Sequence, residues 1–396
     1  MKMNDICLLP ENEPETRHGK VCTLLAESGI DMALIADNAT IYYLTGRVFN
    51  GFVALYAGSP EKTQYFVRRP VGLSGERVHY IRKPEDIPAL MCEGVSTVGL
   101  ELDIQPYSLC TRLSAVFDGK KVMNVSSVVR KARSVKTNHE QGLLQWSGII
   151  HEIVYDNIPK LYREGMTDTE LQIEIERESR LRGCLGQFRI SGASMELFMA
   201  NVLAGDNADN PTPYDFAMGG AGIDPSLPVG ANDTVLKPGM SVMVDCNGNY
   251  TGYMTDMTRV FSIGKLCDLA YKAHDCSRAI CRRFEEIARP GVEAKFLYEE
   301  AVRISDEAGL ADYFMGHRQK AGFVGHGIGI EINEAPVLAP RSRDILEAGN
   351  VIALEPKFVI PGTGAVGIEN SYIITENEPM IITTADENII DLANLK

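Results

Sequence analysis

The amino-acid sequence predicts an α/β N-terminal domain with a mixed sheet, followed by an α+β domain. Short apolar strand patterns alternate with helical patterns over residues 1–130, an order that is typical of α/β domains. A charged segment at residues 130–136 then precedes a long helical pattern, which predicts a domain boundary. Beyond it, a helix followed by strands and a hairpin occurs twice, which favours an α+β domain of two similar halves. The expected domains are residues 1–130 and 131–396.

The elements follow in order from the spacing of apolar residues and turn formers. In the first domain, a helix is expected at residues 21–28, and strands are expected at residues 32–36, 52–56, 63–67 and 95–102. In the second domain, helices are expected at residues 138–162, 170–183 and 293–308. Each of the last two helices has an acidic first turn, which suits the positive end of the helix dipole. One hairpin is expected around Asp245 and another around Glu355.

Acidic residues outnumber basic residues in this chain, 53 against 39, for a formal net charge of −14. This surplus argues against binding nucleic acid or an anionic membrane through a broad electrostatic face, whereas it suits metal cations. With 396 residues, 45% of them hydrophobic, the chain is long enough for two or three globular domains.

The nine cysteines are scattered, and no two of them have C-x-x-C spacing. An odd, scattered set argues against a disulfide framework or a zinc ribbon and fits a reducing compartment. The first 20 residues are polar and lack the apolar run of a signal peptide. No apolar stretch approaches the roughly 18 residues of a membrane span. We therefore expect a cytoplasmic protein.

The most informative segment is residues 241–261, which is rich in β-forming residues and contains a hairpin turn at residues 249–252. The expected centre of this turn lies between residues 250 and 251, midway between Asp245 and Asp256. The two carboxylates are therefore expected to sit opposite each other on one face, with Cβ atoms about 4.5 to 5.5 Å apart.

A second hairpin, residues 351–369, repeats this construction, with Glu355 and Glu369 placed symmetrically about Gly362. Opposed like charges destabilise a sheet unless a cation neutralises them. His326, which has a glycine on each side, offers an unobstructed imidazole. Carboxylates with an imidazole suit two divalent ions about 3.5 to 4 Å apart, which would lower the pKa of a bridging water and polarise a scissile carbonyl.

Several motifs resemble, in order and spacing, those of the metallopeptidase family of methionine aminopeptidase, aminopeptidase P and prolidase. They are residues 236–239 (LKPG), 256–259 (DMTR), 325–329 (GHGIG), 355–356 (EP) and 368–369 (IE). Residues 43–46 (YLTG) look like the family's creatinase/prolidase-type N-terminal domain, and residues 133–140 look like its linker into the catalytic domain. The resemblance covers essentially the whole chain and implies the pita-bread fold for residues 131–396.

The resemblance implies that five residues are metal ligands: Asp245, Asp256, His326, Glu355 and Glu369. Asp256 and Glu369 would bridge two divalent ions per chain. Asp245 would complete the ligand set of one ion, and His326 with Glu355 would complete that of the other. Glu355 would also be the catalytic proton shuttle for the bridging hydroxide. Family members take Mn, Co, Zn or Fe, and the resemblance also implies a homodimer.

Four positions depart from the family pattern, one of them Asn370, where an aspartate is common. Val229 and Asn333 stand where prolidases usually carry histidines, and Gly367 stands where an arginine often precedes the last ligand. Asn333 can still hydrogen-bond a substrate carbonyl, whereas Val229 cannot, and a lost donor at a tetrahedral intermediate typically costs about 10²- to 10³-fold in rate. His317, in the loop after residues 313–316, is a candidate for the missing substrate-binding imidazole.

The sequence therefore predicts a metal-dependent hydrolase that cleaves a small peptide amide bond, as Xaa-Pro dipeptidases and aminopeptidases do. Two alternatives stay open. One is a metal-dependent enzyme for another small molecule, either an amide or amidine hydrolase or a lyase, because the departures fall among residues that would choose the substrate. The other is a catalytically silent binding protein, which the complete set of ligands disfavours, since opposed carboxylates without a cation are destabilising.

Overall fold

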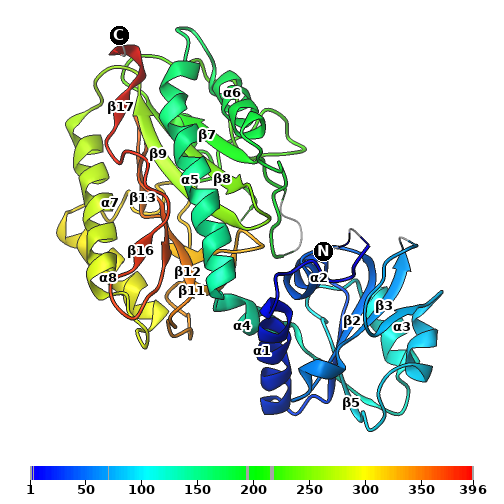
Figure 1. Cartoon of the computed structure of the whole chain (residues 1–396). Helices are drawn as coiled ribbons and strands as arrows, with labels where there is room; N and C mark the ends of the chain where they lie inside the picture. Colours follow the sequence, from blue (N-terminus) through cyan, green and yellow to red (C-terminus); the bar gives the residue numbers. More distant parts are fainter. Residues whose placement is uncertain (1, 3, 70, 193–195, 215–217, 395–396) are drawn as a thin grey trace. The chain divides into compact units, whose positions relative to one another are not determined.

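The computed structural model describes residues 2, 4–69, 71–192, 196–214 and 218–394 (Figure 1). They form two compact units, Met1–Arg133 and Ser134–Lys396. The predicted boundary between residues 130 and 131 falls inside helix α4 (Ser126–Ser134). All nine cysteines are free thiols. Among the described helices, none has both the length and the apolar character that a membrane span requires.

The first unit is built on a six-stranded mixed sheet with the strand order β4-β3-β2-β1-β5-β6. Its strands are β1 (Met32–Ile35), β2 (Asn50–Tyr56), β3 (Gln64–Arg69), β4 (Val78–Tyr80), β5 (Thr97–Leu100) and β6 (Lys121–Asn124). β1 pairs antiparallel with β2 and parallel with β5, so the sheet changes from antiparallel to parallel pairing at its centre. The remaining pairs are antiparallel for β2–β3 and parallel for β3–β4 and β5–β6.

The helices of the first unit are α1 (Glu13–Glu27), α2 (Asn38–Thr45), α3 (Tyr107–Val116) and α4, with 3₁₀ turns η1 (Pro60–Lys62) and η2 (Pro84–Ala89). α1 begins well before the helix predicted at residues 21–28. Its first turns bury Arg17 and His18 instead of apolar residues, so they leave no apolar periodicity in the sequence. Both side chains contact backbone carbonyls of α2: Arg17 donates to that of Tyr43 at 2.7 Å, and His18 Nε2 lies 2.9 Å from that of Leu44.

The second unit contains a four-stranded sheet in the order β17-β9-β8-β7, a five-stranded sheet in the order β11-β10-β12-β15-β16, and the hairpin β13-β14 (Figure 1). The strands of the first sheet are β7 (Ala200–Ala204), β8 (Ser241–Asn249), β9 (Met254–Ser262) and β17 (Ile390–Asp391). The others are β10 (Gly325–Gly327), β11 (Glu334–Leu338), β12 (Val351–Leu354), β13 (Lys357–Ile360), β14 (Gly364–Gly367), β15 (Asn370–Ile373) and β16 (Met380–Ile381).

Two pairs of helices cover these strands. They are α5 (Asn138–Leu161) with α6 (Asp168–Leu181), and α7 (Asp268–Ile287) with α8 (Ala294–Glu307); short 3₁₀ turns are η3 (Gly205–Asp209) and η4 (Leu392–Asn394). α5 and α6 pack on β7–β9, whereas α7 and α8 share a core with the β13–β14 hairpin and the five-stranded sheet (Figure 1). Thr137 and Thr167 cap α5 and α6, each with a glutamate three residues later. The strands therefore lie between two helical layers.

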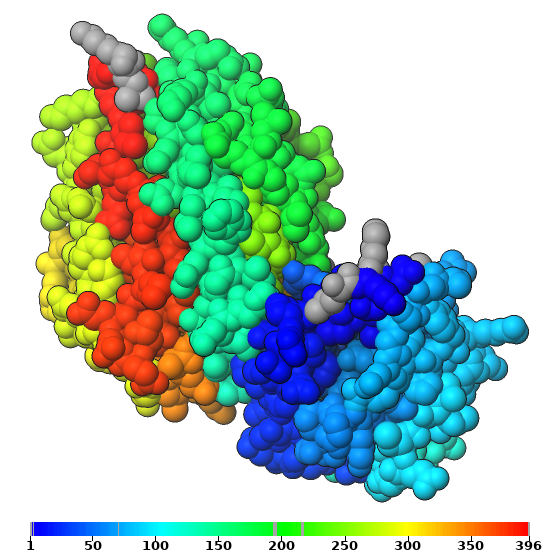
Figure 2. Space-filling view, viewed as in Figure 1, coloured from blue at the N-terminus to red at the C-terminus, as the bar shows by residue number. Residues whose placement is uncertain are grey.

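The C-terminal segment lies on the surface between α5 and α7, where it is red in Figure 2. Thr384 Oγ1 donates to Glu152 Oε2 of α5 at 2.6 Å. On the other side, His274 Nε2 of α7 lies 2.7 Å from the carbonyl oxygen of Glu387. β17 then adds to the edge of the four-stranded sheet beside Phe261 of β9. The segment thereby joins the two helical layers along one side of the second unit.

The β8–β9 hairpin has a different register from the one predicted. Asp245 pairs with Thr258, and Asp256 pairs with Asn247, so the prediction that the two aspartates lie directly opposite each other is wrong. They are diagonal neighbours on the same face. The turn centre lies one residue further along the chain because Gly252 adopts a left-handed conformation, with φ 87°, which few other residues tolerate.

Candidate metal centre

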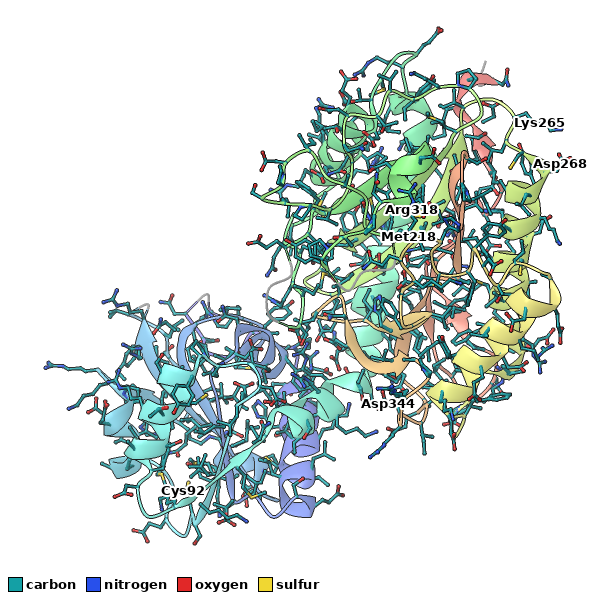
Figure 3. All side chains as sticks on the ribbon, turned by 180° about the vertical axis from the view of Figure 1, so that it is seen from behind. Cys92, Met218, Lys265, Asp268, Arg318 and Asp344 are labelled. Atoms are coloured by element: carbon teal, nitrogen blue, oxygen red, sulfur yellow. The ribbon has the colours of Figure 1, made fainter. Side chains whose placement is uncertain are left out.

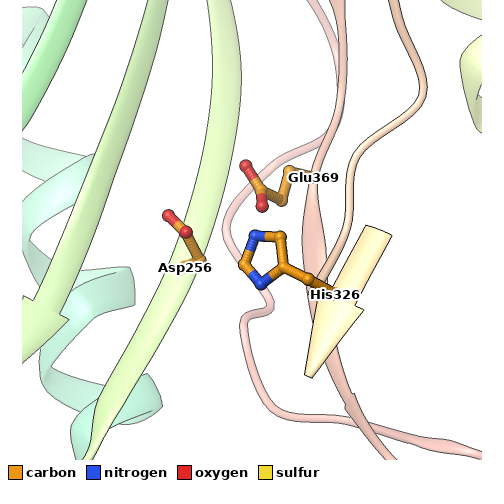
Figure 4. A group of neighbouring side chains, drawn as sticks. All are labelled: Asp256, His326 and Glu369. Carbon is orange, nitrogen blue, oxygen red and sulfur yellow. The ribbon is translucent and has the colours of Figure 1, made fainter. Parts of the chain in front are cut away.

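The second unit brings together all five predicted ligands. Asp245 lies on β8, Asp256 on β9 and His326 on β10, while Glu355 follows β12 and Glu369 follows β14. Ligand atoms of Asp256, His326 and Glu369 lie within 4.8 Å of one another (Figure 4), as do those of Asp245, Glu355 and Glu369. Glu369 belongs to both groups. The four carboxylates are buried, with at most 8% of each residue exposed.

Strand alternation explains why β8 directs its polar side chains towards the cluster. Val244 packs in the core beneath α5 and α6, whereas Met243 packs against Val359 of β13. Asp245 and Asn247 have the same parity as Met243, so they face the β13–β14 side. The first sheet thus presents carboxylate and amide groups to the second hairpin. Asn247 was not among the predicted site residues.

The β13–β14 hairpin keeps the predicted symmetry. Lys357 pairs with Gly367, which places the centre of the ladder at Gly362. Glu355 and Glu369 lie two residues beyond this ladder, and Glu369 forms an isolated bridge with Thr258 of β9. This bridge joins the second hairpin to the first sheet, which is why carboxylates from distant segments meet.

The two carboxylate oxygens of Glu369 have different surroundings. Thr258 Oγ1 donates to Glu369 Oε2 at 2.7 Å. Arg259, which is 2% exposed, donates to the main-chain carbonyl of Glu369 at 2.8 Å and so fixes the backbone. Glu369 Oε1 is buried without a hydrogen-bond partner among the described residues. A buried carboxylate oxygen in this state suits a cation.

His326 presents one ring nitrogen to the cluster. Its Nδ1 lies 3.0 Å from the carbonyl oxygen of Gly327, which can only accept, so Nδ1 carries the proton and Nε2 keeps its lone pair. Burial lowers the pKa of His326, which favours the neutral imidazole. Neutral imidazole is the form that binds metal ions. Nε2 lies 3.5 Å from Glu355 Oε1.

Lys357 is an unpredicted member of the cluster. Its side chain is fully buried, and Nζ lies 2.8 Å from Asp245 Oδ2, 2.7 Å from Glu355 Oε2 and 3.2 Å from Glu369 Oε2. One signal in the sequence could have found it. Lys357 is the charged residue in an otherwise apolar strand, two residues after a predicted ligand, and a strand places such residues on one face.

Burial and the charges of neighbouring carboxylates raise the pKa values of the acidic groups in the cluster. Burial raises the pKa of Asp245 and Glu355 above the usual range. Burial and then the charges of Glu369 and Asp245 raise the pKa of Asp256 still further. Burial by itself would lower the pKa of Lys357, but its three carboxylate partners raise that pKa well above its ordinary value. The group is therefore suited to a further cation.

His317 is oriented by a carboxylate that the sequence analysis did not single out. Its Nδ1 lies 2.9 Å from Asp209 Oδ2, and 38% of the His317 side chain is exposed. The next residue, Arg318, which is labelled in Figure 3, donates its backbone N–H to Asp209 Oδ1 at 3.0 Å. The preceding loop is attached to β13, because the N–H of Met315 donates to the carbonyl oxygen of Lys357 at 2.8 Å.

Three of the four departures from the family pattern, Val229, Asn333 and Gly367, have distinct surroundings. Val229 is buried, with 2% of its surface exposed. Asn333 binds the backbone of Ser191 through both amide atoms, accepting at 2.7 Å and donating at 2.9 Å. Gly367 has φ 132°, and an added Cβ would meet the carbonyl oxygen of Pro356 at 2.5 Å. An arginine at position 367 would therefore need a different local backbone.

Comparisons with known proteins show the family to which the chain belongs. The sequence pattern of metallopeptidase family M24 matches residues 143–376, and that of the creatinase/prolidase N-terminal domain matches residues 17–135. The uncharacterized peptidase YqhT of Bacillus subtilis is 27% identical over 388 residues, covering 94% of this chain and 99% of the relative. The Xaa-Pro dipeptidase of Pyrococcus horikoshii is 25% identical over 379 residues, covering 94% of this chain and 97% of the relative.

Among solved structures, the Xaa-Pro dipeptidase from Bacillus anthracis has a TM-score of 0.80 and 23% identity, covering 95% of this chain and 99% of the other. The predicted fold class, an α/β N-terminal domain with a mixed sheet followed by an α+β pita-bread domain, is confirmed. The prediction of an enzyme of the hydrolase class is also confirmed. Because the family pattern spans more than half of its length, the chain belongs to metallopeptidase family M24.

Proposed function

We propose that this chain hydrolyses the amide bond of a small peptide at the cluster of Asp245, Asp256, His326, Glu355 and Glu369, with Xaa-Pro dipeptides as reference substrates. The observation that carries the proposal is the convergence of these five side chains into two groups of ligand atoms, each within 4.8 Å. The relatives named Xaa-Pro dipeptidase, which match nearly the whole chain, support the choice of peptide.

The group of Asp256, His326 and Glu369 fits a divalent ion, because two carboxylates and a neutral imidazole converge there and Glu369 Oε1 has no hydrogen-bond partner among the described residues. A bound ion would lower the pKa of an attacking water and polarise the scissile carbonyl. These donors suit Mn, Co, Zn or Fe without choosing among them. The identity of the ion and the predicted number, two per chain, stay predictions.

Glu355 is the proposed proton shuttle. Its carboxylate is buried beside Lys357, and burial raises the pKa of Glu355 above the usual range, which is the direction that makes a carboxylate a stronger base. Glu355 would accept a proton from the attacking water and return it to the leaving amine. His317, held by Asp209, and Asn333 are the proposed substrate-binding residues. A homodimer and a cytoplasmic location also stay predictions.

A second candidate function is supported by the substrate side of the site. Val229 is buried and apolar, and both amide atoms of Asn333 already bind Ser191. These are two positions where the family usually carries histidines; neither residue has an imidazole, and the Asn333 amide keeps at most one N–H and one oxygen lone pair for a substrate. This favours, as the second candidate, a metal-dependent enzyme for another small molecule, either an amide or amidine hydrolase or a lyase.

The test is to load the full-length chain separately with Mn²⁺, Co²⁺, Zn²⁺ or Fe²⁺ and measure both ion content and hydrolysis of Xaa-Pro dipeptides and longer Xaa-Pro peptides. We expect ion uptake and turnover. Glu355→Gln should lower kcat by about 10²- to 10⁴-fold, the usual worth of a general base. Asp256→Ala should lose ion uptake, because the group then keeps only two ligands.

The matched control is Asp268→Asn, which removes a carboxylate whose side chain is 94% exposed on α7 (Figure 3). It should change neither ion content nor turnover. Peptide turnover that is absent across the panel while an ion is bound would contradict peptide hydrolysis and favour the second candidate. A chain that takes up none of the four ions would contradict both.

A further inference from the structure

We propose that the ammonium group of Lys357 is a built-in cation that takes the place of one metal ion, so that the cluster binds a single divalent ion per chain. Nζ lies 2.8 Å from Asp245 Oδ2 and 2.7 Å from Glu355 Oε2. It also lies 3.2 Å from Glu369 Oε2. These three residues form one of the two groups of potential metal ligands, so the ammonium sits where a second ion would have to bind.

The backbone holds Lys357 in this place. It starts β13, pairs with Gly367 of β14, and its carbonyl oxygen accepts from the N–H of Met315 at 2.8 Å. The carbonyl oxygen of the preceding Pro356 accepts from Ser277 Oγ of α7. Close approach of the two strands also depends on Gly367, since a Cβ there would lie 3.0 Å from Lys357 Cα. Neighbours on three sides therefore fix the origin of the lysine side chain.

Burial makes displacement of the ammonium costly. The Lys357 side chain is fully buried, so an ion that took its place would have to move a charged group into another buried position or out to solvent. Three close carboxylate partners satisfy its three N–H donors in the described arrangement. The lysine is therefore matched to this position in both charge and hydrogen bonding.

Charge and ligand geometry leave room for one divalent ion. The four carboxylates of the cluster carry four negative charges when ionised, and Lys357 offsets one of them. One divalent ion offsets two more, so the cluster keeps a net charge of only −1. The group of Asp256, His326 and Glu369 suits that ion, because Glu369 Oε1 is buried without a hydrogen-bond partner among the described residues.

The inference concerns the same residues as the proposed function. Its test therefore measures the number of bound ions instead of turnover. Full-length chain is dialysed against excess Mn²⁺ and measured by elemental analysis and by Mn²⁺ electron paramagnetic resonance, which distinguishes isolated ions from coupled pairs. We expect one isolated Mn²⁺ per chain in the wild type. Lys357→Ala removes the ammonium and its volume, so it should bind two Mn²⁺ per chain and give the coupled signal.

The matched control is Lys136→Ala. Lys136 is equally buried but forms its ion pair with Glu334, at 2.9 Å, instead of with a predicted metal ligand, so its loss should leave the count at one. Two coupled Mn²⁺ ions in the wild type would overturn the inference, as would a wild-type chain that binds none. If Lys357→Ala folds and still binds one ion, the inference is also wrong. If Lys357→Ala does not fold, the number of Mn²⁺ ions bound per wild-type chain is the deciding measurement.

These outcomes separate the inference from the proposed function. A chain that binds one Mn²⁺ and cleaves no Xaa-Pro peptide would retain the role of Lys357 and contradict peptide hydrolysis. A chain that binds two coupled ions and cleaves such peptides would contradict the role of Lys357 and support peptide hydrolysis.

Discussion

Asn247 is a buried residue whose amide oxygen and nitrogen both lack a hydrogen-bond partner among the described residues. It is 2% exposed, lies opposite Asp256 across β8–β9, and shares a face with Asp245. An unpaired buried polar group costs about 1 to 3 kcal/mol. A side chain kept at such a cost beside proposed ligands is suited to bind a substrate.

Replacing Asn247 with Ala should therefore raise the free energy of unfolding by about 1 kcal/mol, because the unpaired amide is removed and only a small cavity is left. The measurement is equilibrium unfolding in urea. The matched control is Asn249→Ala on the same face of β8, where the amide donates to Gln187 and accepts from Gly252. That substitution should destabilise the chain. A destabilising effect of Asn247→Ala as large as that of the control would contradict a ligand-binding role.

The β8–β9 hairpin shows how one turn sets the geometry of the site. Its centre decides which β9 residue faces Asp245, and the observed register places Thr258 there instead of Asp256. Thr258 is the residue that donates to Glu369 and forms a bridge with it. The turn residue Gly252, with φ 87°, thus controls how the first sheet meets the second hairpin.

Gly252→Ala should destabilise the chain by about 1 to 2 kcal/mol, because an L side chain in the left-handed region clashes with its own backbone. Gly142→Ala is the matched control. Gly142 lies inside α5 with open space around its Cβ position, so alanine there should stabilise the chain by about 0.5 to 1 kcal/mol. Urea unfolding of both variants checks the opposite signs. Two changes of the same sign would show that the turn does not depend on Gly252.

At the scale of the whole molecule, the Asp and Glu side chains that give the chain its net charge of −14 lie in different environments. Four of them, Asp245, Asp256, Glu355 and Glu369, form the buried ligand cluster of the second unit, which also holds Lys357. In the first unit, Glu101 is 1% exposed and accepts from the backbone N–H groups of Ala36 and Asp37 at 2.8 and 2.9 Å. Burial raises the pKa of Glu101 to about 7.

This pKa predicts how the stability of the chain varies with pH. The ordinary pKa is 4.5, so between pH 4.5 and 7 the folded chain binds more protons at Glu101 than the unfolded chain does. The contribution of Glu101 is therefore fully present below pH 4.5 and is lost as pH rises to about 7, a change of about 3 kcal/mol. Glu101→Gln should remove this dependence, whereas Glu61→Gln on the surface should retain it. The measurement is the free energy of unfolding of each variant between pH 4.5 and 7. If this free energy varies with pH equally in the wild type and in Glu101→Gln, the prediction is wrong.

Much of the fold could be predicted because its signals are local. Apolar periodicity located β1, β2 and α5, and the capping residue Thr137 marks the start of α5. The prediction was less complete where burial involves polar residues, as in the first turns of α1. Such residues are stabilised by hydrogen bonds to another helix, and a local pattern does not contain that information.

The sequence by itself determined the family, the order of the two domains and the residue types that could bind a metal ion, because these are properties of short segments. Only the tertiary structure decided the register of β8–β9, the engagement of Asn333 by Ser191, and the place of Lys357 among the ligands. Lys357 and Asp245 are 112 residues apart in the chain. Their contact exists because the sheet and the second hairpin pack face to face, and that packing depends on the whole fold.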